Sequence, residues 1–296
     1  GRLFRDLTQM DWINVIVQGV LIGGLYALFA AGLSLIFGVM RLVNIAHGDF
    51  IVGAAYLALV IIQMTGLHPL LSLIVVVPLM GCLGYAIQLG LLNRVLGGDI
   101  LPPLIVTFGL SIILQNALLT TFSADSRKLS AGALEVGSLP VLPGVDIGYM
   151  PLLTFVAAVA IIAGLQFLFY HSSMGRAFRA VSDDGEIAQI MGLDNRRVFA
   201  WAMALSMAVV SVAGVFLAVR SNFDPFMGPS RLIFGFEAVI IGGLGNLWGT
   251  LAGGVILGVA QGIGAQIDPG FQLLAGHIAF LIILAVRPRG LFPKVA

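Results

Sequence analysis

Charged residues are scarce in this sequence, and their scarcity decides the class of protein. Only 10% of the 296 residues are Asp, Glu, Lys or Arg, which is well below the level usual for soluble domains. In contrast, 59% of the residues are hydrophobic and the mean hydropathy is +1.06. The formal net charge of +1 gives no indication of a nucleic-acid partner. The composition therefore excludes a soluble domain and predicts an all-α, polytopic membrane protein.

Cysteine and the motifs of enzymes are equally sparse. The single cysteine, Cys82, lies within an apolar run, so it excludes a disulfide framework and a Cys-based metal site, and we expect it to pack in the interior. No second His or Cys lies at a spacing typical of metal ligands. The sequence also lacks a Walker-type glycine loop, a nucleophile elbow and a paired-His zinc motif. We therefore expect no enzyme and no cofactor bound by this chain; if ATP is used, another chain must bind it.

Long apolar runs dominate what remains. Runs of about 20 residues are long enough to cross the hydrocarbon core of a bilayer. They predict spans near residues 12–38, 50–65, 69–92, 101–122, 149–170, 198–219, 232–244, 248–265 and 271–286. The 232–244 run is short for a full crossing, so we expect a broken or re-entrant helix there and about eight or nine spans in one transmembrane domain over residues 1–296. The first run continues as a span, so we expect no cleavable signal.

Two connections between the predicted spans are longer than 20 residues. The first, 123–148, is rich in Gly, Pro and Ser and is expected to be a periplasmic loop. Lys and Arg lie close to the membrane in the second connection, 171–197, and at the C-terminus: Arg176, Arg179, Arg196, Arg197, Arg287, Arg289 and Lys294. Because such residues favour the cytoplasmic side, both segments are predicted inside. Counting back through five spans places the N-terminus outside, although Arg2 and Arg5 favour the opposite.

The second connection is expected to contain an amphipathic helix of about ten residues. Ser182 can cap its N-terminus, with Asp183 and Asp184 in the first turn, where carboxylates oppose the helix dipole. Its apolar face and its end are predicted at Ile187, Ile190, Met191 and Gly192. So short a helix is marginal alone in water, so it needs a surface to cover its apolar face. That surface is either the lipid interface or a cytosolic partner, and the residues alone leave both open.

Several motifs in this sequence resemble those of a known family of transport proteins. "GEIAQIMG" matches the pattern Glu-x-Ala, three residues, then Gly, which marks the cytoplasmic loop of ABC importer permeases, at Glu186, Ala188 and Gly192. The longer "GRAFRAVSDDGEIAQIMGLDNRRV" is similar to the loop of the LIV-type, branched-chain amino acid permeases. Residues 26–50, residues 238–258 and the final "RPRGLF" resemble the same family. The resemblance covers nearly the whole chain.

The resemblance implies a permease subunit of an ABC importer in the bacterial inner membrane. It implies that the chain forms half of a pathway for branched-chain amino acids or similar small polar solutes, such as urea, short amides or organic acids. The implied partners are a second, non-identical permease, two ATPase subunits that bind ATP and Mg²⁺, and a periplasmic binding protein. The residues implied in coupling to the ATPase are Gly175, Arg176, Arg179, Glu186, Ile187, Ala188, Ile190, Met191 and Gly192. The alternative is a self-sufficient secondary transporter or channel, in which Glu237 or Asp49 would carry a proton or cation.

Polar residues inside apolar segments are the candidates for the pathway. A polar group in hydrocarbon is costly, so such side chains normally face the bundle interior or a water-filled cavity. The predicted pathway residues are Asn44, His47, Asp49, Thr107, Gln115, Asn116, Glu237 and Asn246, and Gln18 and Gln88 stand out in the same way.

Two alternative roles remain open for the polar residues of one segment and for Glu237. In "RLVNIAHGDF", His47 and Asp49 could form a gate, or Asn44 and Asp49 could bond nearby backbone amides in a turn that Gly48 allows to bend tightly. Glu237 could recognise an ammonium or amide group of the substrate, or it could be a protonated or paired carboxylate that braces a broken helix. The LIV-type pattern usually has an uncharged residue near this point.

Glycines indicate where helices break or approach closely. Gly243 and Gly245 can interrupt a helix, and Gly249 and Gly253 have the small-xxx-small spacing that brings helices together. Residues 39–58 and 225–243 both look like a break followed by a short helix, so the sequence indicates a weak internal duplication of the kind that transporters often contain.

Overall fold

The computed structural model describes residues 9–97, 99–142 and 145–293, and this part of the chain is mostly helical. Eight of its helices are long and apolar enough to cross a membrane. The long helices are α1 (Gln9–Met40), α2 (His47–Thr65), α3 (Pro69–Gly90), α4 (Leu101–Phe122), α6 (Tyr149–His171), α9 (Asn195–Arg220), α11 (Leu247–Ile267) and α12 (Gln272–Val286). The short elements are α5 (Ala133–Val136), α7 (Ser173–Asp183), α8 (Gly185–Ile190), α10 (Gly228–Gly242), the 3₁₀ turns η1 (Leu92–Arg94) and η2 (Pro269–Phe271), and the strands β1 (Ser138–Leu142) and β2 (Val145–Gly148). The predicted helical membrane fold is confirmed.

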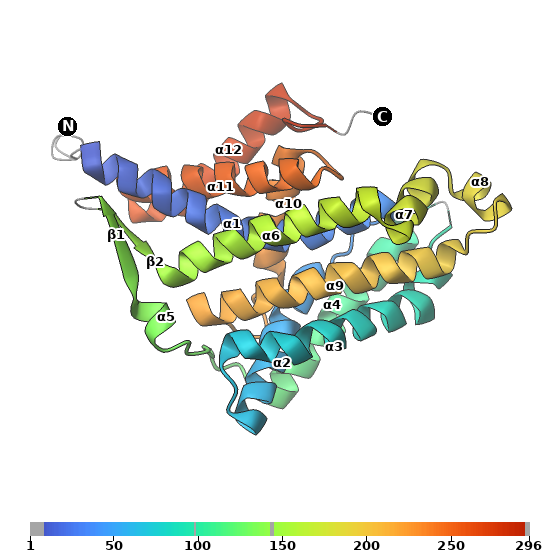
Figure 1. Ribbon diagram of the computed structural model, residues 1–296, viewed down its shortest axis with the longest axis horizontal. Helices are drawn as coiled ribbons and strands as arrows, with labels where there is room; N and C mark the ends of the chain where they lie inside the picture. The colour runs from blue at the N-terminus through green and yellow to red at the C-terminus, as the bar shows by residue number, and fades with distance from the viewer. Residues whose placement is uncertain (1–8, 98, 143–144, 294–296) are drawn as a thin grey trace.

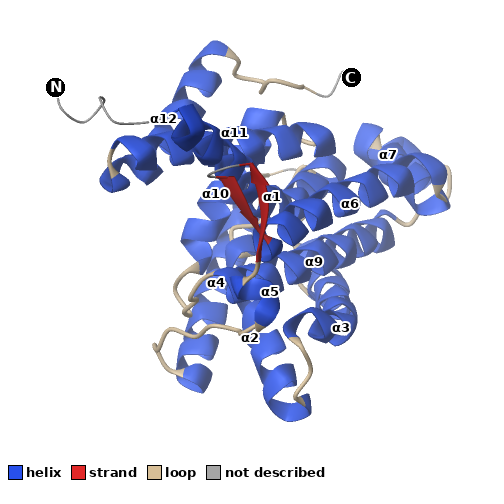
Figure 2. Cartoon of the chain, turned by 60° about the vertical axis from the view of Figure 1, so that its left-hand side comes forward, coloured by secondary structure: helices blue, strands red, loops and turns tan. Residues whose placement is uncertain are grey.

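The two long connections lie at opposite ends of the molecule (Figure 1). The antiparallel hairpin β1–β2 lies at one end, beside the start of α1, where the Gln18 amide donates to the Asp146 carbonyl at 2.8 Å. Helix α8 lies at the other end, and the hairpin is the sole sheet in the described ranges (Figure 2). The described start of α1 therefore lies at the end away from α8, as the count of five spans requires. Arg2, Arg5 and Lys294 lie outside the described residues.

Helices α1 and α9 form the centre of the bundle. In each of these two helices, 83% of an apolar 18-residue stretch is buried inside the chain. The buried share of the corresponding stretch is 22% in α3 and α6 and 11% in α4. Helix α1 packs antiparallel against α11 at glycines on both helices. A Cβ atom on Gly23 would lie 2.5 Å from the Val255 Cα, and one on Gly254 would lie 2.6 Å from the Gly23 carbonyl oxygen. These contacts require glycine, so the α1–α11 interface depends on small residues.

Two helices begin inside the bundle rather than at its surface. A Cβ atom on Gly48, at the start of α2, would lie 1.9 Å from the carbonyl oxygen of Gly228, at the start of α10. From this junction α2 runs toward the hairpin end, where His68 contacts the Ala131 carbonyl, and α10 runs toward the α8 end. Helix α10 has 15 residues, so the prediction of a short, broken piece near residues 232–244 is confirmed. Gly48 was expected to allow a tight bend, and this was wrong: it lies within α2 and permits the contact with α10.

The two halves of the bundle repeat one arrangement with inverted direction. Helix α1 packs on α10 and α11, while α9 packs on α2 and α3. Helices α2 and α10 leave their junction in opposite directions, and α4 and α12 lie beside them in the same relation. Inverted repeats with discontinuous helices meeting inside the membrane are typical of transporters. The break and short helix that the sequence indicates twice are therefore the corresponding parts of the two halves.

Cys82 is exposed, so the expectation that it packs in the interior was wrong. It lies on the outer side of α3, beside a groove that Tyr85 and Trp201 also line. The two aromatic rings meet edge to face with centroids 5.1 Å apart. An apolar run in a membrane helix does not distinguish the protein interior from the lipid side, because both environments are apolar.

Candidate functional site

The connection between α6 and α9 forms a docking loop made of the two helices α7 and α8. The sequence predicted a single helix capped by Ser182, and this was wrong. Ser182 lies in the last turn of α7, and Asp184 caps α8: its Oδ1 accepts hydrogen bonds from the backbone amides of Glu186 and Ile187, both at 3.0 Å. Asp184 has extended backbone angles (φ −151°, ψ 104°), which interrupt the helix between α7 and α8. Both residue types are good N-caps, and in this structure it is Asp184 that leaves the helical conformation and accepts the two amides.

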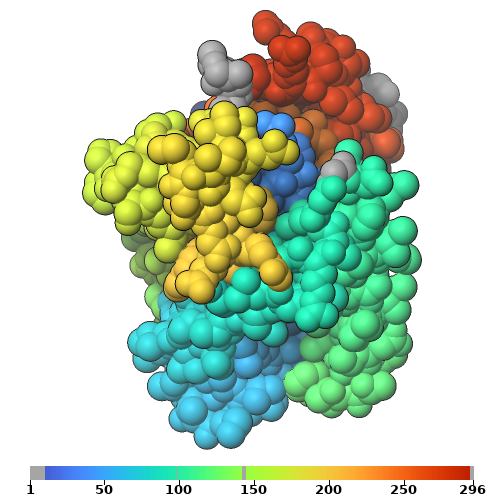
Figure 3. Space-filling view, turned by 90° about the vertical axis from the view of Figure 1, so that its right-hand side faces the viewer, coloured from blue at the N-terminus to red at the C-terminus, as the bar shows by residue number. Residues whose placement is uncertain are grey.

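Three apolar side chains at α8 face away from the rest of the chain: those of Ile187 and Ile190 in the helix and of Met191 directly after it. Ile187, Ile190 and Met191 are 59%, 83% and 79% exposed, whereas Ala188 between them is 4% exposed. Ala188 packs into a cluster with residues of α1, α7 and α9. Gly192 ends the segment with a φ of +91°, which confirms the predicted left-handed residue. The helix is therefore fixed to the protein on one side and presents an uncovered apolar surface on the other. We call Ile187, Ile190 and Met191 the α8 stripe; Figure 3 shows this end of the molecule, with the docking loop in yellow.

The remaining predicted coupling residues hold the docking loop in place or lie on its surface. A Cβ atom on Gly175 would lie 2.2 Å from the Leu168 carbonyl oxygen, so this glycine allows the close turn from α6 into α7. Arg176 and Glu186 are exposed. The Arg179 guanidinium lies over the ring of Tyr170, 5.0 Å from its centroid.

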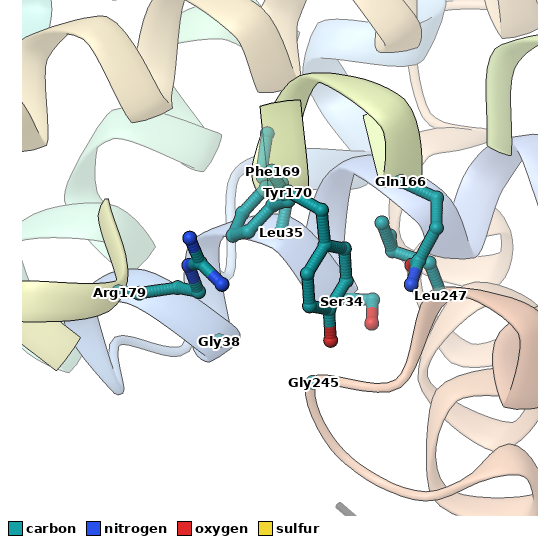
Figure 4. Close-up of a pocket in the computed structure, with 9 residues that line it drawn as sticks. All are labelled: Ser34, Leu35, Gly38, Gln166, Phe169, Tyr170, Arg179, Gly245 and Leu247. Carbon is teal, nitrogen blue, oxygen red and sulfur yellow. The ribbon is translucent and has the colours of Figure 1, made fainter. Parts of the chain in front are cut away.

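A small cavity lies where the docking loop meets the bundle (Figure 4). Its volume is about 50 Å³, which is room for a few water molecules. Ser34 of α1, Gln166 and Tyr170 of α6, and Arg179 of α7 line it together with Gly245 of the turn before α11. The Ser34 side chain is buried, and its hydroxyl has no hydrogen-bond partner among the described residues. Four elements therefore join here around a polar, incompletely bonded space.

Asn246 lies at the same end and has a capping role. Its Oδ1 accepts from the Gly249 amide at 2.9 Å, which caps α11, and its Nδ2 donates to the Phe292 carbonyl at 2.8 Å. The side chain thus ties the C-terminal segment to the turn between α10 and α11. The structure places it at the α8 end, away from the α2–α10 junction.

The segment 41–46, between α1 and α2, is an ordered break. Asn44 Oδ1 accepts from the Ala46 amide at 3.0 Å, as the turn interpretation predicted. The Ile45 amide donates to Thr107 Oγ1 of α4 at 3.2 Å. The His47 ring nitrogen Nε2 lies 2.8 Å from the Phe29 carbonyl of α1. The break is therefore bonded to both α1 and α4.

Asp49 connects the start of α2 to α4. Its carboxylate accepts from Ser111 Oγ at 2.5 Å and from Gln115 Nε2 at 2.9 Å. The turn interpretation was wrong for this residue, because its partners are side chains of another helix. Ser111 was not predicted, although Ser111 and Gln115 are four residues apart and so share one face of α4. Asn116, which is predicted for the pathway, lies on the surface of the chain, and its amide donates to the Ile112 carbonyl at 2.8 Å.

Glu237 is buried and paired. Its Oε1 lies 2.5 Å from Nδ1 of His277 on α12; the Glu237 side chain is 6% exposed and that of His277 is 42% exposed. Glu237 Oε2 has no partner among the described residues. The pairing with His277 was not predictable from the sequence, because the two residues are 40 positions apart on different helices. Nearby, the buried Tyr26 hydroxyl donates to Oε1 of Gln261, so α1 and α11 are joined at the same level.

The other polar candidates have local roles. Gln88 is buried and donates to Asn93 at 2.9 Å, and Asn93 in turn donates to the Arg196 carbonyl. Gln18 bonds the hairpin, as described above. Neither residue lies at the α2–α10 junction.

The described bundle has two helices that begin against each other in its interior, buried polar groups around that junction, and a short helix with an uncovered apolar face at one end. These features define a polytopic transport protein. Residues 15–286 match the family model described as "Branched-chain amino acid transport system / permease component". The chain belongs to this family: it is a multi-pass membrane permease of the bacterial ABC transport systems, a transport subunit and not an enzyme.

Three relatives illustrate the similarity. The permease protein BraD of the high-affinity branched-chain amino acid transport system of Pseudomonas aeruginosa is 31% identical, over 96% of each chain. The permease protein LivH of Escherichia coli strain K12 is 28% identical, also over 96% of each chain. The permease protein LivM of the same strain is 23% identical, over 91% of this chain and 68% of its own.

Proposed function

We propose that this chain forms half of the translocation pathway of an importer driven by ATP hydrolysis on separate subunits. The observation that carries the proposal is the α8 stripe, three exposed apolar side chains on a helix that the buried Ala188 fixes to the bundle. Helices that lie at a lipid interface are typically rich in Lys and Arg on their polar face. The sequence of α8, GEIAQI, contains Glu186 and no basic residue. A protein partner therefore explains the α8 stripe better than lipid does.

The partners proposed are a second, non-identical permease, two ATPase subunits and a periplasmic binding protein. Two different permease proteins, LivH and LivM, carry the name of one transport system in Escherichia coli, and both are similar to this chain. Two related but distinct permeases would together enclose one pathway. ATP and Mg²⁺ would bind to the ATPase subunits, and the α8 end would face the cytoplasm.

The pathway is proposed to pass the α2–α10 junction. Helix N-termini carry a partial positive charge, and the Asp49 carboxylate already occupies this position at the junction, against Gly228 at the start of α10. The carboxylates of Asp49 and Glu237 on the same two helices could attract an ammonium group. Such carboxylates fit a solute that carries an ammonium group, and we propose branched-chain amino acids or similar small polar solutes as the substrates.

Reconstituted uptake tests the proposal. The substrate is first identified by measuring which solute the cognate periplasmic binding protein binds. Uptake of that solute into proteoliposomes is then expected to require the binding protein, the ATPase subunits and ATP together. Uptake by this chain alone, driven by a proton gradient, would show instead a self-sufficient secondary transporter in which Asp49 or Glu237 carries the ion.

A further inference from the structure

Ser182 joins the docking loop to the end of the central helix α1. Its Oγ donates to the Gly38 carbonyl at 2.6 Å, across 144 positions of the sequence. Gly38 lies in the last turn of α1, where carbonyl groups have no partner within the helix. The docking loop therefore supplies a hydrogen bond that the end of α1 lacks by itself.

Arg41 meets the same serine from the break. Its Nη2 lies 3.5 Å from the Ser182 carbonyl oxygen, and its amide bonds the Phe37 carbonyl at 3.0 Å. Its φ is +52°, a left-handed conformation that a residue other than glycine rarely adopts. Arg41, the first residue of the break, is therefore held in an unfavourable backbone conformation next to the docking loop.

The break leads from Arg41 to the pathway. Arg41 lines a cavity of about 470 Å³ that also touches Asp99, Pro103 of α4 and Phe199 of α9. Four residues further along the chain, the Ile45 amide bonds Thr107, one turn from Pro103 on α4. A shift of α7 would therefore act on the end of α1, on the break and on the wall of this cavity at once.

We propose that Ser182 and Arg41 form a latch that transmits movement of the docking loop to the break between α1 and α2, and so controls the cavity at the α8 end of the pathway. Both are positioning residues, since they act through the break and do not contact the solute. The inference rests on the proposed function, because it requires that an ATPase moves the docking loop.

The test measures how much ATP the reconstituted complex hydrolyses for each solute imported. Ser182→Ala removes the hydroxyl that bonds Gly38. Arg41→Gly removes the guanidinium while suiting a positive φ, so it should not disturb the backbone. Each variant is expected to assemble with the ATPase and to hydrolyse roughly two- to tenfold more ATP per solute, the range expected for the loss of one hydrogen bond. Ser182→Thr keeps a hydroxyl and should retain the normal ratio. Ser130→Ala, in the loop at the opposite end, is the control and should also retain it.

A combined variant separates the latch from a general structural role. If the two residues act as one unit, Ser182→Ala with Arg41→Gly should raise the ratio no more than the larger single effect. An unchanged ratio in both single variants, with normal uptake by the unmodified complex, would overturn the latch alone. A ratio that stays normal while the melting temperature falls would also overturn it. If the unmodified complex imports without ATP, the proposed function fails, and the latch fails with it.

Discussion

Single polar residues determine where the helices of this bundle meet. Asp49 is buried at the start of α2, where the helix dipole favours a carboxylate, and two neutral side chains of α4 donate to it. Glu237 on α10 is paired with His277 on α12. In each half of the bundle, one acid on α2 or α10 therefore reaches the outer helix beside it, α4 or α12. A buried acid with such partners fixes position as well as charge, because an unpartnered polar group is costly in an apolar environment.

Asp49→Ala is predicted to destabilise the complex. The change leaves the buried Ser111 hydroxyl without its acceptor, while Gln115 Nε2 keeps its bond to Ser111 Oγ at 3.1 Å. An unsatisfied buried polar group costs about 1–3 kcal/mol. A thermal unfolding curve of the purified complex should therefore shift to a lower melting temperature. Ser130→Ala is the control, since the Ser130 side chain is exposed in the loop that follows α4 and should leave the curve unchanged. Equal melting temperatures for both variants would contradict the role given to Asp49.

Glu237→Gln tests whether this acid serves the pathway or braces the fold. A glutamine can still bond His277, so assembly and basal ATPase activity are expected to stay nearly intact. Loss of the negative charge is expected to slow uptake if the carboxylate attracts an ammonium group. His277→Gln is measured beside it. If the pair only braces α10 against α12, both variants should show the same small change in melting temperature and the same uptake. A lower melting temperature with unchanged uptake would remove Glu237 from the pathway.

At the scale of elements, the apolar runs and the glycines were sufficient to predict most of the helices. Run length alone located the spans, and the short run near residues 232–244 indicated a broken helix. It did not show that this helix begins against α2. The packing of α1 on α11 and the pairs Asp49–Ser111 and Glu237–His277 could not be predicted, because each depends on which faces of distant helices meet. The division of the docking loop into α7 and α8 was missed for a local reason. Both Ser182 and Asp184 are good caps, and sequence pattern does not show which of them leaves the helical conformation.

The α8 stripe is predicted to be the contact with the ATPase. Ile190 is 83% exposed in the isolated chain, and burying such a side chain is worth roughly 1.5–3 kcal/mol. Ile190→Asp should therefore release the ATPase or leave hydrolysis uncoupled from uptake, without unfolding the spans. Gln189→Ala, at an exposed polar position of the same helix, is the control and should retain coupling.

Gly192→Val should have a similar effect by a different route. The φ of +91° at Gly192 is strained for a β-branched residue, so the turn that follows the α8 stripe would change its course. Binding-protein-stimulated ATPase activity is measured with uptake in the same proteoliposomes. If α8 lies on lipid, both Ile190→Asp and Gly192→Val would keep ATP-driven uptake, and that result would refute the docking role.

At the scale of the whole molecule, the surface of the chain indicates that it is incomplete alone. Only 11% of the apolar 18-residue stretch of α4 is buried, and only 6% of that of α12. Yet α4 carries Ser111, which bonds the buried Asp49, and α12 carries His277, which pairs with the buried Glu237. Helix α4 also exposes Asn116 and Thr120 between its apolar residues. Polar groups on a spanning helix normally face protein or water rather than lipid. A second permease that covers α4 would place the Asp49 cluster at the boundary between the two subunits.

Purification from native membranes is predicted to recover this chain with a second, non-identical permease and two ATPase subunits. The reason is that a single chain offers one α8 stripe and one half of the pathway, so two permeases and two ATPases complete a symmetric assembly. The mass of the intact complex and the identity of its subunits, measured by mass spectrometry after mild detergent extraction, check the composition directly. The Ile190→Asp variant provides the internal control: it should still recover the second permease, because that contact lies within the membrane, while recovering less ATPase. Recovery of a homo-oligomer without any ATPase would refute the assembly. Full recovery of ATPase together with normally coupled uptake in the variant would show that the ATPase binds elsewhere than on the α8 stripe.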